Sequence, residues 1–132
     1  MSDDPLLLRV DGPVVDAEVA DPDRAQGDAL QVRMLVDTGA ELSVLPRDVI
    51  DALGLPRRRE VEIAGVVPRA FMWCPVFRVV LHLAGGAFEI EVAALPRDEV
   101  AGGIVGRDLL SHLVFTYDGP RGTFVVSSPP VT

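Results

Sequence analysis

The residues best suited to chemistry are Asp37, Thr38 and Gly39, which follow the apolar run Met34 to Val36. A carboxylate beside apolar residues is costly unless it is paired or hydrogen-bonded, and such positions are often functional. A carboxylate that shares a proton with a second one can act as general base on water. The same triplet also suits a plain turn, in which Asp accepts backbone hydrogen bonds and Gly adopts a positive φ. By itself the triplet leaves both interpretations open.

A second motif, Gly-Ile-Val-Gly-Arg-Asp-Leu-Leu, begins at Gly103. Each of the two motifs places a short hydrophobic strand before a glycine-containing turn and then a helix. The chain therefore carries a coarse internal repeat. The first copy has an ionisable residue, Asp37, at its turn, and the second copy has a glycine there.

Together the two motifs resemble those of the retropepsins, the retroviral-type aspartic proteases and their cellular relatives. Residues 35–40 match two hydrophobic residues followed by Asp-Thr/Ser-Gly-Ala, and residues 104–110 match two hydrophobic residues followed by Gly-Arg-Asp/Asn-Leu-Leu. The order of strands, active-site loop, flap hairpin and second motif also matches, over residues 6–126. The resemblance implies an all-β fold, namely a closed retropepsin-like barrel with two short helices and a flap hairpin.

The resemblance implies an aspartic endopeptidase in which Asp37 activates water. This chemistry needs two carboxylates that share a proton, and the sequence contains a single Asp-Thr/Ser-Gly. The second carboxylate is therefore expected from Asp37 of another copy, in a symmetric homodimer. The substrate would be a polypeptide, and the reaction would need no metal and no organic cofactor.

The resemblance also assigns roles around Asp37. Thr38 would hold the two loops of the dimer together through its hydroxyl, and Gly39 would offer its carbonyl to the substrate. Ala40 and Glu41 would line the substrate site. Glu41 would also face Arg107, whose guanidinium is expected to be at least half buried and to tie the second helix to the Glu41 loop.

Two further sets of residues are assigned in the same way. Substrate contacts from the flap are expected at Ile63, Ala64, Gly65, Val66 and Val67. Structural support for the site is expected from Gly106, Arg107 and Asp108, with Asp108 near the start of the second helix.

Most of the chain reads as short strands separated by turn residues, which is typical of an all-β barrel or sandwich. Alternating hydrophobicity predicts strands over residues 6–10, 14–20, 29–36, 60–65, 69–73, 77–83 and 87–95, and a last hairpin over 113–127. Helices are predicted over 46–55, where Pro46 suits the first turn and Gly54 the end, and over 107–113.

The composition fits one domain over residues 1–132, with a core over about 6–126 and a loose C-terminal tail, since 48% of the 132 residues are hydrophobic. A net charge of −8 disfavours nucleic acid or an anionic membrane as the main partner. No apolar run reaches membrane-spanning length and the N-terminus is acidic, so a cytoplasmic protein is expected. The single cysteine and the two distant histidines predict no disulfide and no metal site.

Other conspicuous residues favour structural interpretations. The run Arg57 to Arg59 is expected to be a solvated loop rather than a substrate-facing patch. Met72 and Trp73 are expected to pack in the core or a dimer contact rather than to touch substrate. Cys74 should be a thiol in apolar surroundings, and His82 should point outward from its strand.

Two alternatives to a protease remain open. A retropepsin fold can bind peptides or proteins, or dimerise, with weak or no proteolysis. Alternatively, the Asp37 turn can be a turn without chemistry in an unrelated β-barrel.

Overall fold

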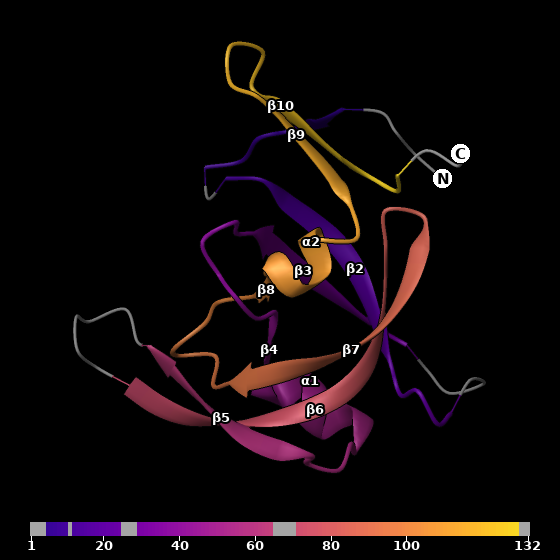
Figure 1. Ribbon diagram of the computed structural model, residues 1–132, viewed down its shortest axis with the longest axis vertical. Coiled ribbons are helices and arrows are strands. Elements are labelled where there is room, and N and C mark those ends of the chain that lie inside the picture. Colours follow the sequence, from indigo (N-terminus) through magenta and orange to yellow (C-terminus); the bar gives the residue numbers. More distant parts are fainter. Residues whose placement is uncertain (1–4, 11, 25–28, 65–70, 130–132) are drawn as a thin grey trace.

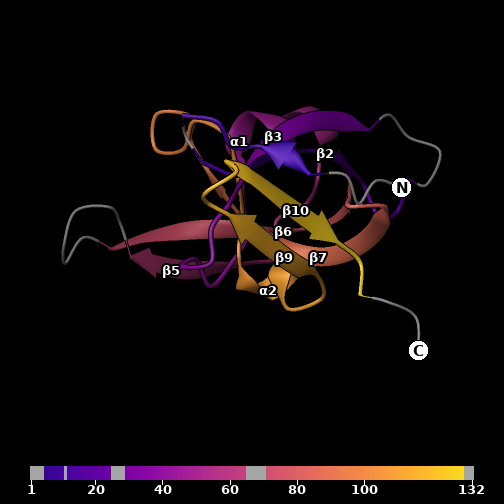
Figure 2. The ribbon, with the colours of Figure 1, turned by 90° about the horizontal axis from the view of Figure 1, so that it is seen from above.

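A computed structural model describes residues 5–10, 12–24, 29–64 and 71–129. Seven strands form one sheet in the order β2-β3-β8-β4-β7-β6-β5, and pairing of β2 with β6 closes its first six strands into a barrel. A three-stranded sheet, β1-β10-β9, lies across one end of the barrel (Figures 1 and 2). The strands and helices are β1 (Leu6–Leu7), β2 (Val14–Ala20), β3 (Leu30–Val36), β4 (Val44–Pro46), α1 (Arg47–Leu53), β5 (Arg59–Ala64), β6 (Phe71–Leu83), β7 (Gly86–Leu95), β8 (Gly103–Val105), α2 (Arg107–Leu110), β9 (Val114–Asp118) and β10 (Thr123–Ser127).

The barrel core follows from the alternation in β2 and β3. Val15, Ala17 and Val19 of β2 are buried, and the residues between them in β2 are exposed. Across the antiparallel pair, Val15 faces Met34 and Ala17 faces Val32, so both strands direct their apolar side chains to the same interior. The period of two that predicted these strands is therefore also the reason that they close over a core.

Strand β6 is one strand of 13 residues, and not the two pieces that the sequence predicted on either side of Pro75. Its buried side chains change face along its length. Cys74 and Val76 are buried from one face, and Phe77 and Val79 from the other. Cys74 on the first face belongs to a small hydrophobic cluster, and Phe77 and Val79 on the second face belong to the main core. Pro75 stands opposite Glu60 in the register, so the chain remains extended through the proline.

The two motifs of the internal repeat lie side by side. β3 and β8 are parallel, with Leu35 beside Ile104 and Val36 beside Val105. The following residues, Asp37 and Gly106, therefore begin neighbouring turns. Strand β4, which the sequence did not predict, lies on the other side of β8 and pairs with β7. Because β8 lies between β3 and β4 in the sheet, the segment from Asp37 to Ser43 crosses from one side of β8 to the other.

The helices are shorter than predicted. α1 buries Val49 and Ile50, and ends at Gly54, which has a left-handed φ of 66° and donates its N–H to the carbonyls of Ile50 and Asp51. α2 is a four-residue turn of helix that buries Leu109. The predicted first strand shortens to two residues, whereas the three predicted hairpins, β5–β6, β6–β7 and β9–β10, are present.

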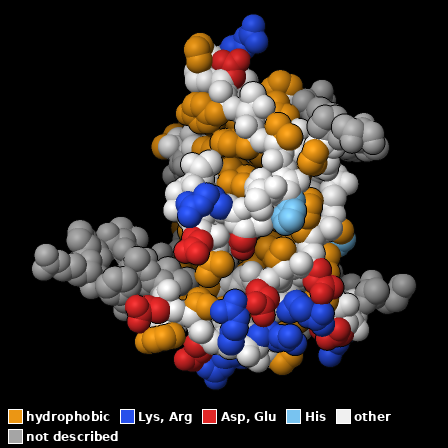
Figure 3. Space-filling view, viewed as in Figure 1, with side chains coloured by type: hydrophobic (Ala, Val, Ile, Leu, Met, Phe, Trp, Pro, Cys, Tyr) orange, Lys and Arg blue, Asp and Glu red, His pale blue; other side chains and the backbone are white. Residues whose placement is uncertain are grey.

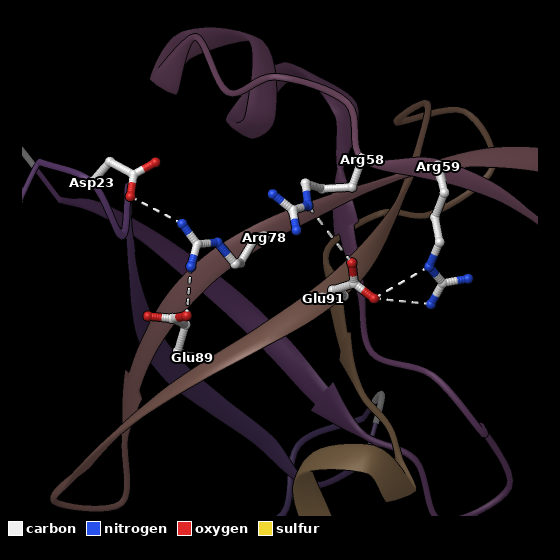
Figure 4. A network of polar contacts seen from close by, with 6 residues as sticks. All are labelled: Asp23, Arg58, Arg59, Arg78, Glu89 and Glu91. Carbon is white, nitrogen blue, oxygen red and sulfur yellow. Dashed lines mark hydrogen bonds and ion pairs between the residues drawn. The ribbon is translucent and has the colours of Figure 1, made fainter.

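The surface has two different regions. Charged side chains gather over β5, β6 and β7, whereas hydrophobic ones gather around β9 and β10 (Figure 3). On the charged region, Arg58 and Arg59 both contact Glu91, at 4.0 and 3.0 Å, and Arg78 contacts Glu89 and Asp23 (Figure 4). The arginine run is exposed and paired, which supports its interpretation as a solvated segment. In the described part of the chain, no helix is long and apolar enough to span a membrane.

Candidate active site

The turn after β3 holds the Asp37 carboxylate in a defined orientation. The N–H of Asp37 donates to the carbonyl of Val105 at 2.9 Å, and the carbonyl of Asp37 accepts from the N–H of Ala40 at 3.1 Å. Its Oδ1 accepts from the N–H of Gly39 at 2.9 Å. Asp37 is half buried, whereas Thr38 and Gly39 are exposed. The carboxylate is therefore fixed by the backbone and stands at the protein surface.

The second motif packs closely against the backbone of the segment that follows Asp37. At Gly106, a Cβ atom would lie 2.6 Å from the carbonyl carbon of Leu42, which is closer than non-bonded atoms approach. The N–H of Arg107 donates to the carbonyl of Ala40 at 2.8 Å, and the N–H of Asp108 donates to that of Glu41 at 3.3 Å. The first turn of α2 is thus bonded directly to the segment that follows Asp37.

Ser43, which was not among the predicted site residues, joins the same two segments through its side chain. It is the one fully buried polar residue among those that the structure describes. Its Oγ donates to Oδ1 of Asp108 at 2.7 Å and accepts from the N–H of Gly106 at 3.0 Å. Its own N–H donates to Oδ2 of Asp108 at 3.0 Å. A serine inside the apolar run from Leu42 to Leu45 was the available signal, because a buried hydroxyl needs a partner.

Asp108 and Arg107 both support the site, but Arg107 does so differently from the prediction. Asp108 also accepts from the N–H of Leu109 at 2.8 Å, inside the first turn of α2. Arg107 is exposed, and its guanidinium donates to the carbonyl of Thr38 at 3.0 Å. The prediction of a half-buried guanidinium tied to the Glu41 loop was therefore wrong. As the first residue of a short surface helix, Arg107 extends back over the Asp37 turn instead.

A groove with a volume of about 650 Å³ lies along β3 and β8, the strands that lead into the two neighbouring turns. Leu35 and Ile104, neighbours in the register, both line it and are half buried. Asp37 is not among the lining residues, and it follows the end of β3, two residues after Leu35. Figures 1 and 2 show the β5–β6 hairpin projecting to the same side of the barrel as the β7–β8 connection.

The flap prediction is confirmed as a hairpin only up to its tip. Ile63 pairs with Met72, and Ala64 with Phe71. Gly65, Val66 and Val67 lie outside the described residues, so their predicted substrate contacts stay predictions. Trp73 is 65% exposed, so it does not pack in the core, and its packing in a dimer contact stays a prediction. It shares the outward face of the hairpin with Glu62, its register partner.

The remaining candidates do not take part in the site. His82 is exposed between buried Leu81 and Leu83, as predicted. Cys74 is buried, and this burial, with a smaller contribution from Glu99, raises the pKa of its thiol. Among the described residues, no three or more His, Cys, Asp or Glu side chains are grouped so that they could hold a metal ion.

Several known proteins are similar to this chain in sequence or in fold. A family model described as aspartyl protease matches residues 15–109. A retropepsin-like aspartic protease from Rickettsia conorii has a TM-score of 0.65 at 17% identity, covering 92% of this chain and 87% of that one. The retroviral protease-like domain of Ddi1 from Leishmania major has a TM-score of 0.53 at 18% identity, covering 89% and 94%. The EIAV protease in complex with an inhibitor also has a TM-score of 0.53, at 21% identity, covering 75% and 85%. No curated protein matches the chain significantly.

Proposed function

This chain belongs to the aspartyl protease family and has the retropepsin-like fold, and from that premise we propose that it is an aspartic endopeptidase that acts as a homodimer. One observation carries the proposal. The Asp37 carboxylate is held by its own turn at the surface, and the neighbouring turn of the same chain has Gly106 at the corresponding position. A glycine supplies no carboxylate, so we infer that the second one comes from Asp37 of another copy.

In this proposal, the two Asp37 carboxylates share one proton, because two close carboxylates do not readily both ionise. The ionised one takes a proton from water, which attacks the peptide carbonyl carbon. The protonated one donates a hydrogen bond to the carbonyl oxygen and polarises it. The proton taken from water then passes from that carboxyl group to the leaving nitrogen as the C–N bond breaks. The hydrogen bond from Gly39 N–H orients each carboxylate for these steps.

The surface around the turn suits a second copy. Thr38 and Gly39 are exposed, and we propose that the Thr38 hydroxyl bonds to the partner's loop. Among the residues that the structure describes, five of the six exposed large hydrophobic side chains lie in the N-terminal segment and β9; they are Leu6, Leu7, Val10, Val114 and Tyr117. Exposed apolar groups that gather in one region are typical of an interface, and they support association through this end of the molecule.

The groove gives the proposal a place for substrate. Leu35 and Ile104 offer an apolar surface beside Asp37, which suits an apolar peptide side chain next to the scissile bond. We propose that Gly39, Ala40 and Glu41 contact the peptide backbone. The β5–β6 hairpin would close over the substrate and exclude water, with Ile63 to Val67 as its contacts.

The test compares the wild-type chain with Asp37→Asn on a peptide library from acid to neutral pH. Asparagine keeps a side-chain oxygen that can accept from Gly39 N–H, so the turn is preserved while the carboxylate is lost. The matched control is Asp51→Asn, an exposed carboxylate on α1. We expect cleavage by the wild type and the control, and none by Asp37→Asn. Equal cleavage by Asp37→Asn would refute the proposal, and peptide binding without cleavage by the wild type would favour a binding module.

A further inference from the structure

The β7–β8 connection, residues 96–102, forms one wall of the groove. Arg97, Glu99, Val100 and Ala101 line the groove from this connection, and β2 and β3 line it from the opposite side. The distance between the connection and β3 therefore sets how wide a side chain the groove accepts. The contacts that hold the connection in place therefore affect which substrate side chains the groove accepts.

Part of the connection is anchored by burial. Val100 is only 8% exposed and packs in the small hydrophobic cluster with Cys74 and Ala93. Gly102 lies against β3 so closely that a Cβ there would be 2.7 Å from the carbonyl oxygen of Arg33. Arg97, by contrast, is exposed, and polar contacts of its guanidinium hold it.

The Arg97 guanidinium makes three hydrogen bonds that join two parts of the structure, the β7–β8 connection and α1. Its Nε donates to Oδ1 of Asp48 at 2.9 Å, and its Nη2 to Oδ2 at 3.3 Å, which makes a two-point contact with the first turn of α1. Its Nη1 donates to the carbonyl of Ala101 at 2.7 Å, across the connection itself. One side chain thus closes the connection into a ring and fastens that ring to α1.

We propose that Arg97 is a positioning residue that sets the width of the substrate groove by tying its wall to Asp48. The role in specificity rests on the proposed protease function, whereas the tie itself does not. The pair is half exposed, at 51% and 58% for the two side chains, so its contribution to global stability is small. Its effect is expected to be local, on the connection and on the peptides that the groove accepts.

The first experiment does not depend on activity. We would measure amide hydrogen exchange over residues 97–103 in the Asp37→Asn background, with Arg97→Met, Arg97→Lys and Asp48→Asn added one at a time. Arg97→Met removes the charge and keeps an aliphatic side chain, and Arg97→Lys keeps the charge without the planar fork. The matched control is Arg78→Met, because Arg78 is another arginine that joins two segments through ion pairs, here with Glu89 and Asp23, and does not line the groove (Figure 4).

We expect all three variants at the tie, and not the control, to speed exchange in the connection while the barrel strands remain unchanged. Adding Asp48→Asn to Arg97→Met should change exchange little, because Arg97→Met already removes the contact with Asp48. Unchanged exchange in Arg97→Met, or equal acceleration by Arg78→Met, would overturn the tie.

The second experiment measures kcat and KM for peptides that differ in the size of one side chain. For Arg97→Met we expect KM to rise roughly twofold to fivefold with kcat little changed, which corresponds to the loss of an exposed ion pair. The ratio of kcat/KM between peptides with a small and a large side chain at that position should move closer to one. An unchanged KM and preference would refute the role in specificity even if exchange is faster. If the wild type cleaves no peptide, the protease proposal fails, whereas the exchange measurements still decide the tie.

Discussion

The hydroxyl oxygen of Ser43 lies 2.7 Å from Oδ1 of Asp108, although 65 residues separate them in the chain. The contact joins the segment that follows Asp37 to the first turn of α2. The same hydroxyl accepts the N–H of Gly106, so the two halves of the internal repeat are fastened at one buried atom. The orientation of the Asp37 turn therefore depends on a pair of residues that are not themselves part of the proposed chemistry.

Ser43→Ala should lower the free energy of unfolding by about 1–3 kcal/mol, the cost of leaving a buried polar group without its partner. The N–H of Gly106 and Oδ1 of Asp108 would both lose a bond. Urea unfolding measures the change. Ser111→Ala is the control, because the Ser111 hydroxyl contacts the Asp108 carbonyl from an exposed position, and it should change stability by less than about 0.5 kcal/mol. Equal stabilities for the two variants would show that the buried contact contributes nothing.

Gly106→Ala should destabilise the protein by about 1–3 kcal/mol, because the new methyl group would meet the backbone of Leu42 at 2.6 and 2.7 Å. A backbone segment moves less easily than a side chain, so the Asp37 turn would have to shift. Gly119→Ala is the control, since a Cβ there meets only the Tyr117 ring, at 3.5 Å. Thermal unfolding of both variants checks this. A wild-type melting temperature for Gly106→Ala would mean that the close approach is relieved without cost.

The features that could be predicted from the sequence are those with a local cause. Alternation in residues 14–20 gave β2, and turn residues between apolar runs gave the three hairpins. The family motif predicts Asp37 as the catalytic residue. The register of β3 with β8 explains why the second motif matters, since it places a glycine turn beside the Asp37 turn.

The features that could not be predicted depend on distant partners. β4 is three residues long, too short to show a period, and it exists because β7 and β8 flank it. Trp73 and Cys74 have opposite exposure because successive side chains of a strand point to opposite faces, and β6 buries the Cys74 face until the change between Val76 and Phe77. The direction of Arg107 depends on where α2 meets the Thr38 carbonyl, which no local pattern encodes.

The pH dependence of the Arg97–Asp48 contact should be visible in acid. A hydrogen bond from Arg97 is the main cause that lowers the pKa of Asp48 below its ordinary value of 3.8. The stabilisation is therefore complete above pH 3.8, where the unfolded carboxyl is ionised, and is lost as the pH falls through the lower pKa of the folded state. The melting temperature of wild type should exceed that of Asp48→Asn by a small, constant amount from neutral pH to about pH 5, and the difference should close at lower pH. In an Arg97→Met background, Asp48→Asn should leave the melting temperature nearly unchanged at every pH. A decrease as large as in the wild-type background would show that Arg97 is not the main cause of the lowered pKa of Asp48.

Cys74 should react slowly with thiol reagents in the folded protein. Its side chain is 1% exposed, and burial raises the pKa of its thiol above the ordinary value of 9.0. Because the thiolate is the reactive form, alkylation at neutral pH should be far slower in native buffer than in urea. Mass spectrometry of iodoacetamide-treated protein over time measures both rates. Equal rates would show that the small cluster beneath the groove opens readily, which would also weaken the view of the groove wall as a fixed surface.

A shared active site makes the inactive variant an inhibitor of the wild type. If each dimer needs two Asp37 carboxylates, a mixed dimer with Asp37→Asn is inactive. At a fixed wild-type concentration, an equal amount of the variant should reduce peptide cleavage to about one half, and a threefold excess to about one quarter, once the chains have exchanged. Adding a charge to the exposed apolar region, as Asp37→Asn/Tyr117→Asp, should weaken this inhibition if the region lies in the interface. Cleavage that is unaffected by Asp37→Asn, and that rises linearly with wild-type concentration, would mean that a single chain carries the complete site.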